Sequence, residues 1–170
     1  MREKYKIDCP LISCPILKYN RIELVNNDDV IEILPTDPFF CRKAIYKIAL
    51  YFKREFKYDF VQYSVEEDYR KSHHAFAFVK WNYDGKYLVY GAFCMRWRNK
   101  MKEIMDHWGL QWIWLHPFER CKGHLSEIWE GLNHHFPGFI VESPLSSGML
   151  NFLEKRKCID SHASYDSVRK

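Results

Sequence analysis

Two neighbouring stretches in the middle of the chain alternate between two sets of side chains with a period of two residues. In residues 74–83 one set is Ala75, Ala77, Val79 and Trp81, and the other is Phe76, Phe78 and Lys80. Asp84 and Gly85 follow, a pair typical of the two-residue turn between antiparallel strands, whose central positions need positive φ. The pattern predicts a β-hairpin made of residues 74–83 and 87–97.

A helical pattern precedes the hairpin. Thr36, Asp37 and Pro38 predict its start, because proline is tolerated in a first turn, where its missing N–H would have no partner anyway. Apolar residues then recur three or four apart, at Ile45, Ile48, Ala49, Phe52 and Phe56. One face of this helix is therefore expected in the core.

The first 34 residues carry weaker patterns. Pro10 and Pro15 predict irregular structure over residues 1–20. Residues 21–34 contain two short apolar clusters on either side of the polar turn at 26–29. We expect two short strands joined by that turn.

The second half of the chain alternates strand and helix patterns. Residues 109–115 and 138–142 predict strands, 146–155 a final helix, and the polar residues 98–106 a helix or a loop. Between the two strands, helical spacing relates Leu125, Ile128, Trp129 and Leu132. A strand–helix–strand crossover implies that the two strands are parallel. The expected fold class is α/β, with a mixed, mostly antiparallel sheet, one parallel strand pair and flanking helices.

Composition narrows the class of protein. The length of 170 residues suits one domain, and 47% hydrophobic with 17% aromatic residues excludes a disordered chain. The net charge of +4 is short of the basic surface of a dedicated DNA-binding domain and equally suits a phosphate-bearing small molecule. The interleaved basic and aromatic residues at 96–102 make a nucleic-acid-binding module an alternative, which this single short cluster supports weakly.

Six cysteines are scattered along the chain. The apolar stretch 9–17 is too short for a signal peptide and is broken by two prolines, and no run approaches the ~18 apolar residues of a membrane span. We therefore expect free thiols and a cytoplasmic protein with no membrane association. Cys9 and Cys14, together with the histidine pairs at 73–74 and 134–135, raise the alternative of zinc, but their spacing is poor and no metal site is predicted.

The segment from Leu115 to Leu125 carries the most specific chemistry. It lies between a predicted buried strand and an amphipathic helix, where backbone N–H groups and the helix dipole favour an anion. Gly123 has no side chain to keep a ligand from the backbone, and Arg120 and Lys122 add positive charge. This combination suits a pyrophosphate, although the spacing matches neither Gly-x-x-x-x-Gly-Lys-Ser/Thr nor Gly-x-Gly-x-x-Gly.

Residues 120–125 resemble the pyrophosphate loop of the GNAT superfamily of acyl-CoA-dependent N-acyltransferases. The family signature is Arg/Gln-x-x-Gly-x-Gly/Ala after a strand, and this chain reads Arg-Cys-Lys-Gly-His-Leu, with Leu125 departing from the small last residue. The order of hairpin, strand, helix, parallel strand and final helix extends the resemblance over residues 74–157. In the final helix, Leu153 stands where the family often has a tyrosine.

The resemblance implies where acetyl-CoA binds. The strands ending at Leu115 and beginning near residue 138 would splay apart, and backbone groups of Ile113 and Leu115 would pair with the pantetheine arm. The Leu115 N–H would be the oxyanion donor. The implied cofactor-binding residues are Ile113, Trp114, Leu115, Arg120, Cys121, Lys122, Gly123, His124, Leu125, Ser126 and Ser146. On pattern alone, Trp112 and Trp114 share one face of the strand and are expected in the core.

The acid and base are less clear from the residues. The family often has a carboxylate or histidine on the strand before the loop, but here that strand offers Gln111, which is a poor proton acceptor. Glu142, at the end of the second strand, is the candidate base, and Tyr165 is the candidate acid.

The resemblance predicts one domain over residues 1–170, with a CoA-binding core at 74–157 and a variable acceptor side at 1–73. The expected activity is transfer of an acetyl group from acetyl-CoA to an amine on a small molecule or protein, by direct attack in a ternary complex. The expected assembly is a monomer or homodimer, with no metal. The alternative is a non-catalytic GNAT-like domain that binds CoA or a partner protein.

Overall fold

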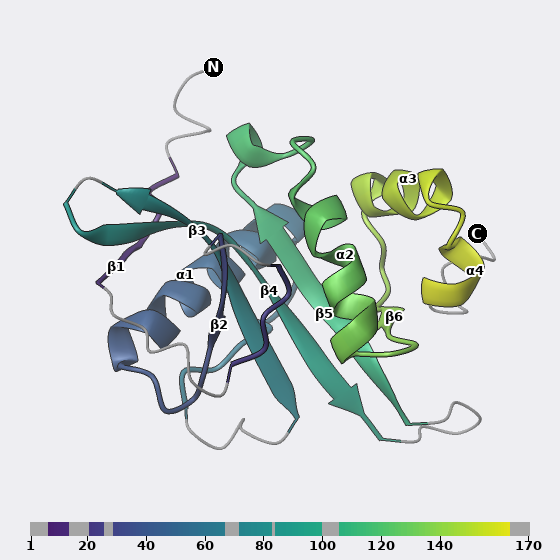
Figure 1. Cartoon of the computed structure of the whole chain (residues 1–170), viewed down its shortest axis with the longest axis horizontal. Helices are drawn as coiled ribbons and strands as arrows, with labels where there is room; N and C mark the ends of the chain where they lie inside the picture. Colours follow the sequence, from purple (N-terminus) through teal and green to yellow (C-terminus); the bar gives the residue numbers. More distant parts are fainter. Residues whose placement is uncertain are drawn as a thin grey trace.

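Six strands form one mixed sheet in the computed structural model, which describes residues 7–13, 21–25, 29–66, 72–82, 84–99 and 106–163 (Figure 1). The strands are β1 (Leu11–Ser13), β2 (Val30–Ile33), β3 (His73–Asn82), β4 (Lys86–Arg98), β5 (His107–Leu115) and β6 (Ile140–Val141). The order is β2-β3-β4-β5-β6, and β1 pairs with the start of β4. Only β5 and β6 pair in parallel among these described strands, so the predicted mixed, mostly antiparallel sheet is confirmed.

Helices cover both faces of this sheet. They are α1 (Phe39–Phe56), α2 (His124–His135), α3 (Ser147–Lys155) and the short α4 (Ile159–His162), with a 3₁₀ turn, η3, at Pro117–Glu119. Figure 1 shows α1 behind the strands and α2 in front of them. The predicted alternation in β3 explains this layering: Ala75, Ala77 and Val79 belong to the core with α1, and Phe76 and Phe78 to the core with α2. The hairpin of β3 and β4 is confirmed.

The N-terminal part differs from the sequence prediction in two places. Residues 1–20 are not wholly irregular, because Leu11–Ser13 forms β1 and buries Ile12 completely. Residues 21–25 form no strand, although β2 follows them as expected. The Ile22 N–H, which a strand would donate across a ladder, donates instead to the Glu32 carboxylate at 2.7 Å.

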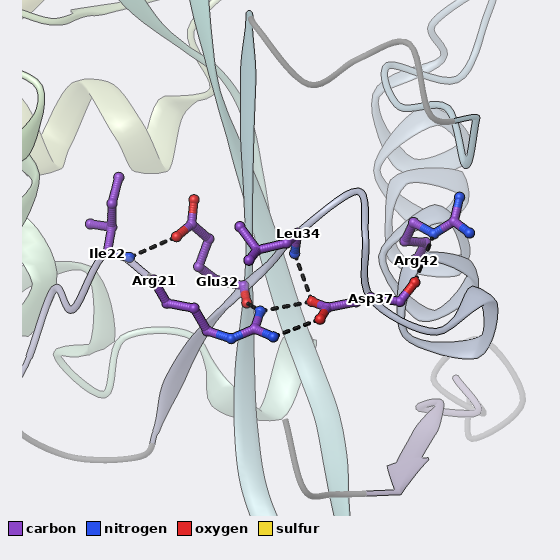
Figure 2. Close-up of polar contacts among 6 residues, drawn as sticks. All are labelled: Arg21, Ile22, Glu32, Leu34, Asp37 and Arg42. Carbon is purple, nitrogen blue, oxygen red and sulfur yellow. Dashed lines mark hydrogen bonds and ion pairs between the residues drawn. The ribbon is translucent and has the colours of Figure 1, made fainter. Parts of the chain in front are cut away.

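A buried polar network holds this segment against β2 and α1 (Figure 2). The Arg21 guanidinium donates to both carboxylate oxygens of Asp37, at 2.6 and 2.7 Å, and to the Glu32 carbonyl. Asp37 lies one residue before Pro38, the cap of α1, and also accepts from the Leu34 N–H. The side chains of Arg21 and Asp37 are each 8% exposed, so the ion pair is nearly dry. It fixes where α1 begins, as the sequence predicted from Asp37 and Pro38.

A bulge in β5 decides which way its residues face. Cys94 of β4 lies opposite Trp112, but the next residue, Met95, lies opposite Leu110, so Gln111 is an extra residue in β5. A bulge reverses the alternation of a strand. Leu110 accordingly packs in the core with α2, whereas Trp112 and Trp114 pack in the core with α1. Both tryptophans are 2% exposed, which confirms that they are core residues.

Candidate functional site

The ladder between β5 and β6 is short, and beyond it the two segments separate. Gly109 lies opposite Ile140 and Leu110 opposite Val141, and the Glu142 N–H still donates to the Leu110 carbonyl at 3.0 Å. Past that bond a cleft of about 220 Å³ separates Gln111–Ile113 from residues 142–146. The predicted splayed parallel pair is therefore confirmed, although its second strand is only Ile140–Val141.

The cleft passes through the gap in the sheet, because its walls come from both faces. Phe52 and Trp112 belong to the core with α1, and Met149 and Val141 to the core with α2 and α3. The full lining is Phe52, Phe56, Tyr58, Leu110, Gln111, Trp112, Ile113, Val141, Glu142, Pro144, Leu145, Ser146 and Met149. Ile113, Glu142 and Ser146 are the sequence-predicted site residues among these.

Backbone groups of β5 face the open side of the cleft. The His116 N–H donates to the Tyr90 carbonyl of β4 at 2.8 Å. In an antiparallel pair, the backbone N–H and C=O groups of alternate residues point to the partner strand. The backbone groups of Trp112 and Trp114 therefore point to β4, and those of Ile113 and Leu115 point away from it. The Leu115 carbonyl accepts from the Arg120 Nε at 2.9 Å, as this orientation requires. An extended ligand could pair with the N–H groups of Ile113 and Leu115.

Glu142, which lines the cleft, is held in an ion pair. The Arg98 guanidinium donates to both carboxylate oxygens of Glu142, with Nε at 2.6 Å from Oε1. Gly109 leaves room for it, because a Cβ at that position would lie 2.3 Å from Glu142 Oε1. Glu142, the candidate base, therefore lies at the cleft, but both of its carboxylate oxygens already accept hydrogen bonds from Arg98. Sequence reasoning missed Arg98 as its partner, because 44 residues separate the two.

Two glutamines meet on the α1 side of the cleft. The Gln111 amide donates to the Gln62 side-chain oxygen at 2.8 Å, and the Trp112 indole donates to the Gln62 carbonyl at 3.0 Å. The Gln111 Oε1 is buried and has no hydrogen-bond partner among the described residues. A buried acceptor without a donor is costly, so such an atom points to a ligand or water as its partner.

The loop before α2 presents backbone N–H groups to one side. Cys121 and Gly123 have positive φ, 61° and 94°, and the Glu127 N–H makes the first helical bond, to the Gly123 carbonyl. The N–H groups of residues 124–126 thus precede the helical ladder. A Cβ at Gly123 would meet no atom within 4 Å, so the space above the backbone is open. This geometry can receive an anion.

The charged side chains of the loop make contacts that the sequence did not predict. Lys122 Nζ lies 3.1 Å and His124 Nε2 3.3 Å from the same Glu119 oxygen. Partial burial raises the pKa of Glu119, but the hydrogen bonds from Lys122 and His124 bring it below its usual value. A carboxylate therefore stays ionised beside the anion-binding backbone.

Arg120 is turned toward α1. Its guanidinium donates to both oxygens of Glu55, each at 2.7 Å, and lies 5.6 Å from the Trp114 ring centre. The Trp114 indole also donates to Glu55, at 2.7 Å. These bonds join α1, β5 and the loop, and no sequence pattern could have shown that Glu55 lies beside a loop 65 residues away.

The other site residues that the sequence predicted differ in exposure and in contacts. Cys121 and Ser126 are exposed, Leu125 is half-buried, and Ser146 caps α3 by accepting from the Met149 N–H at 3.2 Å. Leu153 is completely buried in the core with α2. Tyr165, like Cys14, lies outside the described residues.

The described part of the chain contains neither a metal-binding cluster nor a membrane-spanning helix. No group of three or more histidine, cysteine, aspartate or glutamate side chains in it could hold a metal ion. Within the same residues, every helix is too short or too polar to span a bilayer. Cys9, Cys94, Cys121 and Cys158 are free thiols.

Comparison with known proteins identifies the fold. No family model and no curated protein matches the sequence. The xEco2 acetyltransferase domain bound to a CoA conjugate matches with a TM-score of 0.59 and 14% identity, over 85% of this chain and 96% of that chain. A second structure of that domain gives 0.56 and 13%, over 85% and 95%. The chain therefore has the fold of the GNAT acetyltransferases.

Proposed function

We propose that this protein binds acetyl-CoA and transfers its acetyl group to an amine by direct attack in a ternary complex. The observation that carries the proposal is the splayed β5–β6 pair, which opens a cleft in a sheet with the acetyltransferase fold. The fold match to a domain bound to a CoA conjugate agrees with this use of the cleft.

The cofactor would lie along β5. The pantetheine arm pairs with the backbone groups of Ile113 and Leu115 that face away from β4, in the manner of an added strand. The pyrophosphate accepts from the backbone N–H groups of residues 120–126 at the start of α2, with Lys122 and His124 beside it. Ser146, which lines the cleft, completes the proposed set, whereas Trp114, which the sequence also suggested, has backbone groups that face β4 and is not part of it.

The reaction needs a neutral amine, an oxyanion donor and a leaving thiolate. The amine nitrogen attacks the thioester carbonyl, and the carbonyl oxygen becomes an oxyanion that accepts from a β5 N–H. The sequence suggests the Leu115 N–H, and the Ile113 N–H, which faces the same side, lies within the cleft lining. The C–S bond then breaks, the amine proton passes to Glu142, and the CoA thiolate takes a proton from Tyr165 or water.

A non-catalytic CoA-binding domain is the second candidate. Two observations favour it: Leu153 fills a core position where the family often has a tyrosine, and Arg98 engages both oxygens of Glu142. This domain would bind acetyl-CoA without turnover, so the two candidates differ in the release of CoA when amines are supplied.

The melting temperature with and without acetyl-CoA tests the cofactor site. At about 100 times Kd, binding stabilises the folded state by about 2.7 kcal/mol, which raises Tm by roughly 5–10 °C for a domain of this size. Gly123→Glu should abolish the rise, because it adds a carboxylate where the phosphates would lie. Gly123→Gln is the matched control, since both variants carry the same strain at φ +94° and differ in charge. No rise at millimolar acetyl-CoA contradicts both candidates.

A further inference from the structure

The α1 side of the cleft is apolar, aromatic and small. Phe52 is the centre of a ring cluster, with centroids 5.0 Å from Phe56, 5.1 Å from Tyr58 and 5.8 Å from Trp112. All four rings line the cleft. Its volume of about 220 Å³ is below the roughly 300–1,000 Å³ of most ligand pockets, so it suits one small group beside the thioester.

The cleft has few groups that could bind a polycation. Glu142 is the one acidic residue among the described residues of the lining, and both of its oxygens already accept from Arg98. The Phe52 ring is packed against three other rings, so its faces are not open to a cation. Several positive charges on one acceptor would therefore lack partners in this cleft.

One buried hydrogen-bond acceptor near these aromatic rings has no donor among the described residues. Gln111 Oε1 is buried without a donor, and the residue is the extra one in the β5 bulge, beside Ile113. The bond from its amide to Gln62 holds the side chain in place. An amine N–H would supply the missing donor and lie next to the strand where the thioester is proposed to bind.

On this basis, and resting on the proposed acetyl transfer, we propose that the acceptor is a primary amine on a single ring-sized apolar group, an arylalkylamine. The ring packs against Phe56 and Tyr58, and the amine donates to Gln111 Oε1. Gln111 is thus a positioning residue for the acceptor.

The experiment uses 2-phenylethylamine and spermidine as probes. CoA release measures kcat and KM at saturating acetyl-CoA, and calorimetry measures amine binding to the protein with and without CoA. We expect kcat/KM for 2-phenylethylamine to exceed that for spermidine at least tenfold. A preference for spermidine, or acetyl-CoA binding with neither binding nor acetylation of 2-phenylethylamine, overturns the inference.

Variants test the two proposed contacts. Phe56→Ala removes a ring that is 40% exposed and lines the cleft, and should raise the KM for 2-phenylethylamine about tenfold with kcat little changed. Phe60→Ala, at a 65% exposed ring outside the lining, is the matched control and should change neither. Gln111→Leu should raise this KM likewise, with kcat little changed. Unchanged KM in both Phe56→Ala and Gln111→Leu contradicts the inference.

The design separates this inference from the proposed function. If acetyl-CoA fails to raise Tm, the proposed function fails, and calorimetry with 2-phenylethylamine alone still shows whether the cleft binds the amine. If acetyl-CoA raises Tm but 2-phenylethylamine does not bind, only the assignment of the acceptor fails.

Discussion

The Glu142 side chain lies against Gly109 beside the short β5–β6 ladder, so closely that a methyl group on Gly109 would lie 2.3 Å from the Glu142 carboxylate. This approach leaves Glu142 in position to accept from Arg98 on both oxygens. It also ties the candidate base to the point where the sheet opens.

We predict that Glu142→Gln lowers kcat/KM by at least about 10²-fold if Glu142 is the base, because general-base catalysis typically contributes 10²–10⁴-fold. The loss should be seen with acetyl-CoA binding unchanged in the Tm assay. Gly109→Ala, whose added methyl group displaces the carboxylate from Arg98 without removing it, should lower kcat/KM less than Glu142→Gln does. If Glu142→Gln keeps the full kcat/KM at every pH tested, Glu142 is not the base and its role is structural.

The loop carboxylate offers a second prediction. Glu119 contacts both Lys122 and His124, and its lowered pKa keeps it ionised at neutral pH, where it opposes a phosphate at the same side chains. We expect Glu119→Gln to tighten acetyl-CoA binding by about two- to fivefold, and Lys122→Met to weaken it by a similar factor. Calorimetric Kd values at two salt concentrations measure both effects. Weaker binding by Glu119→Gln would show that the carboxylate orders the loop instead.

The Arg21–Asp37 pair should matter to stability far more than the exposed pairs do. Removing one partner of a buried ion pair leaves the other uncompensated, at a cost of about 3–5 kcal/mol, so Arg21→Met should lower Tm by about 10 °C or more. Asp8→Asn is the control: Asp8 pairs with Lys47 but is 91% exposed, and its loss should cost under about 1 kcal/mol. Chemical denaturation gives both values, and similar costs would contradict the prediction.

Glu55 gives a prediction about pH. The Arg120 hydrogen bonds lower the pKa of Glu55; partial burial opposes this and the Trp114 indole adds to it. A lowered folded pKa stabilises the protein above the unfolded pKa of about 4.3, and this contribution is lost as pH falls through the folded value. The stability gap between the natural protein and Glu55→Gln should therefore be constant from about pH 7 to 5 and shrink below about pH 4.

The size of that gap should be modest, about 1 kcal/mol or less, because Glu55 and Arg120 are each more than a third exposed and water screens them. Denaturation of both proteins across this pH range measures it. Glu130→Gln, at a carboxylate 85% exposed and 3.6 Å from Arg156, is the control and should show a smaller gap. A gap that widens as the pH falls would contradict the assignment of the Glu55 shift to Arg120.

From residue 36 onward, the sequence by itself determined the main strands and helices and their order. The two-residue alternation predicts the hairpin of β3 and β4 because each face of those strands packs on a different helix layer. The helical stripe around Ile48 and the crossover from β5 to β6 are likewise local patterns, and they suffice for the mixed sheet. The motif at 120–125 predicts the loop before α2 because a glycine with positive φ is a local requirement.

Only the tertiary structure decided which side chains meet at the cleft. The strand expected in residues 21–25 is absent because Ile22 donates to Glu32, a contact between separate segments. The bulge at Gln111 depends on the pairing of β5 with β4, and it turns Trp112 toward α1 and leaves Ile113 facing the cleft. Arg98 with Glu142 and Arg120 with Glu55 are ion pairs between residues 44 and 65 positions apart. Such pairs follow from the packing of the whole sheet, so no local pattern could have indicated them.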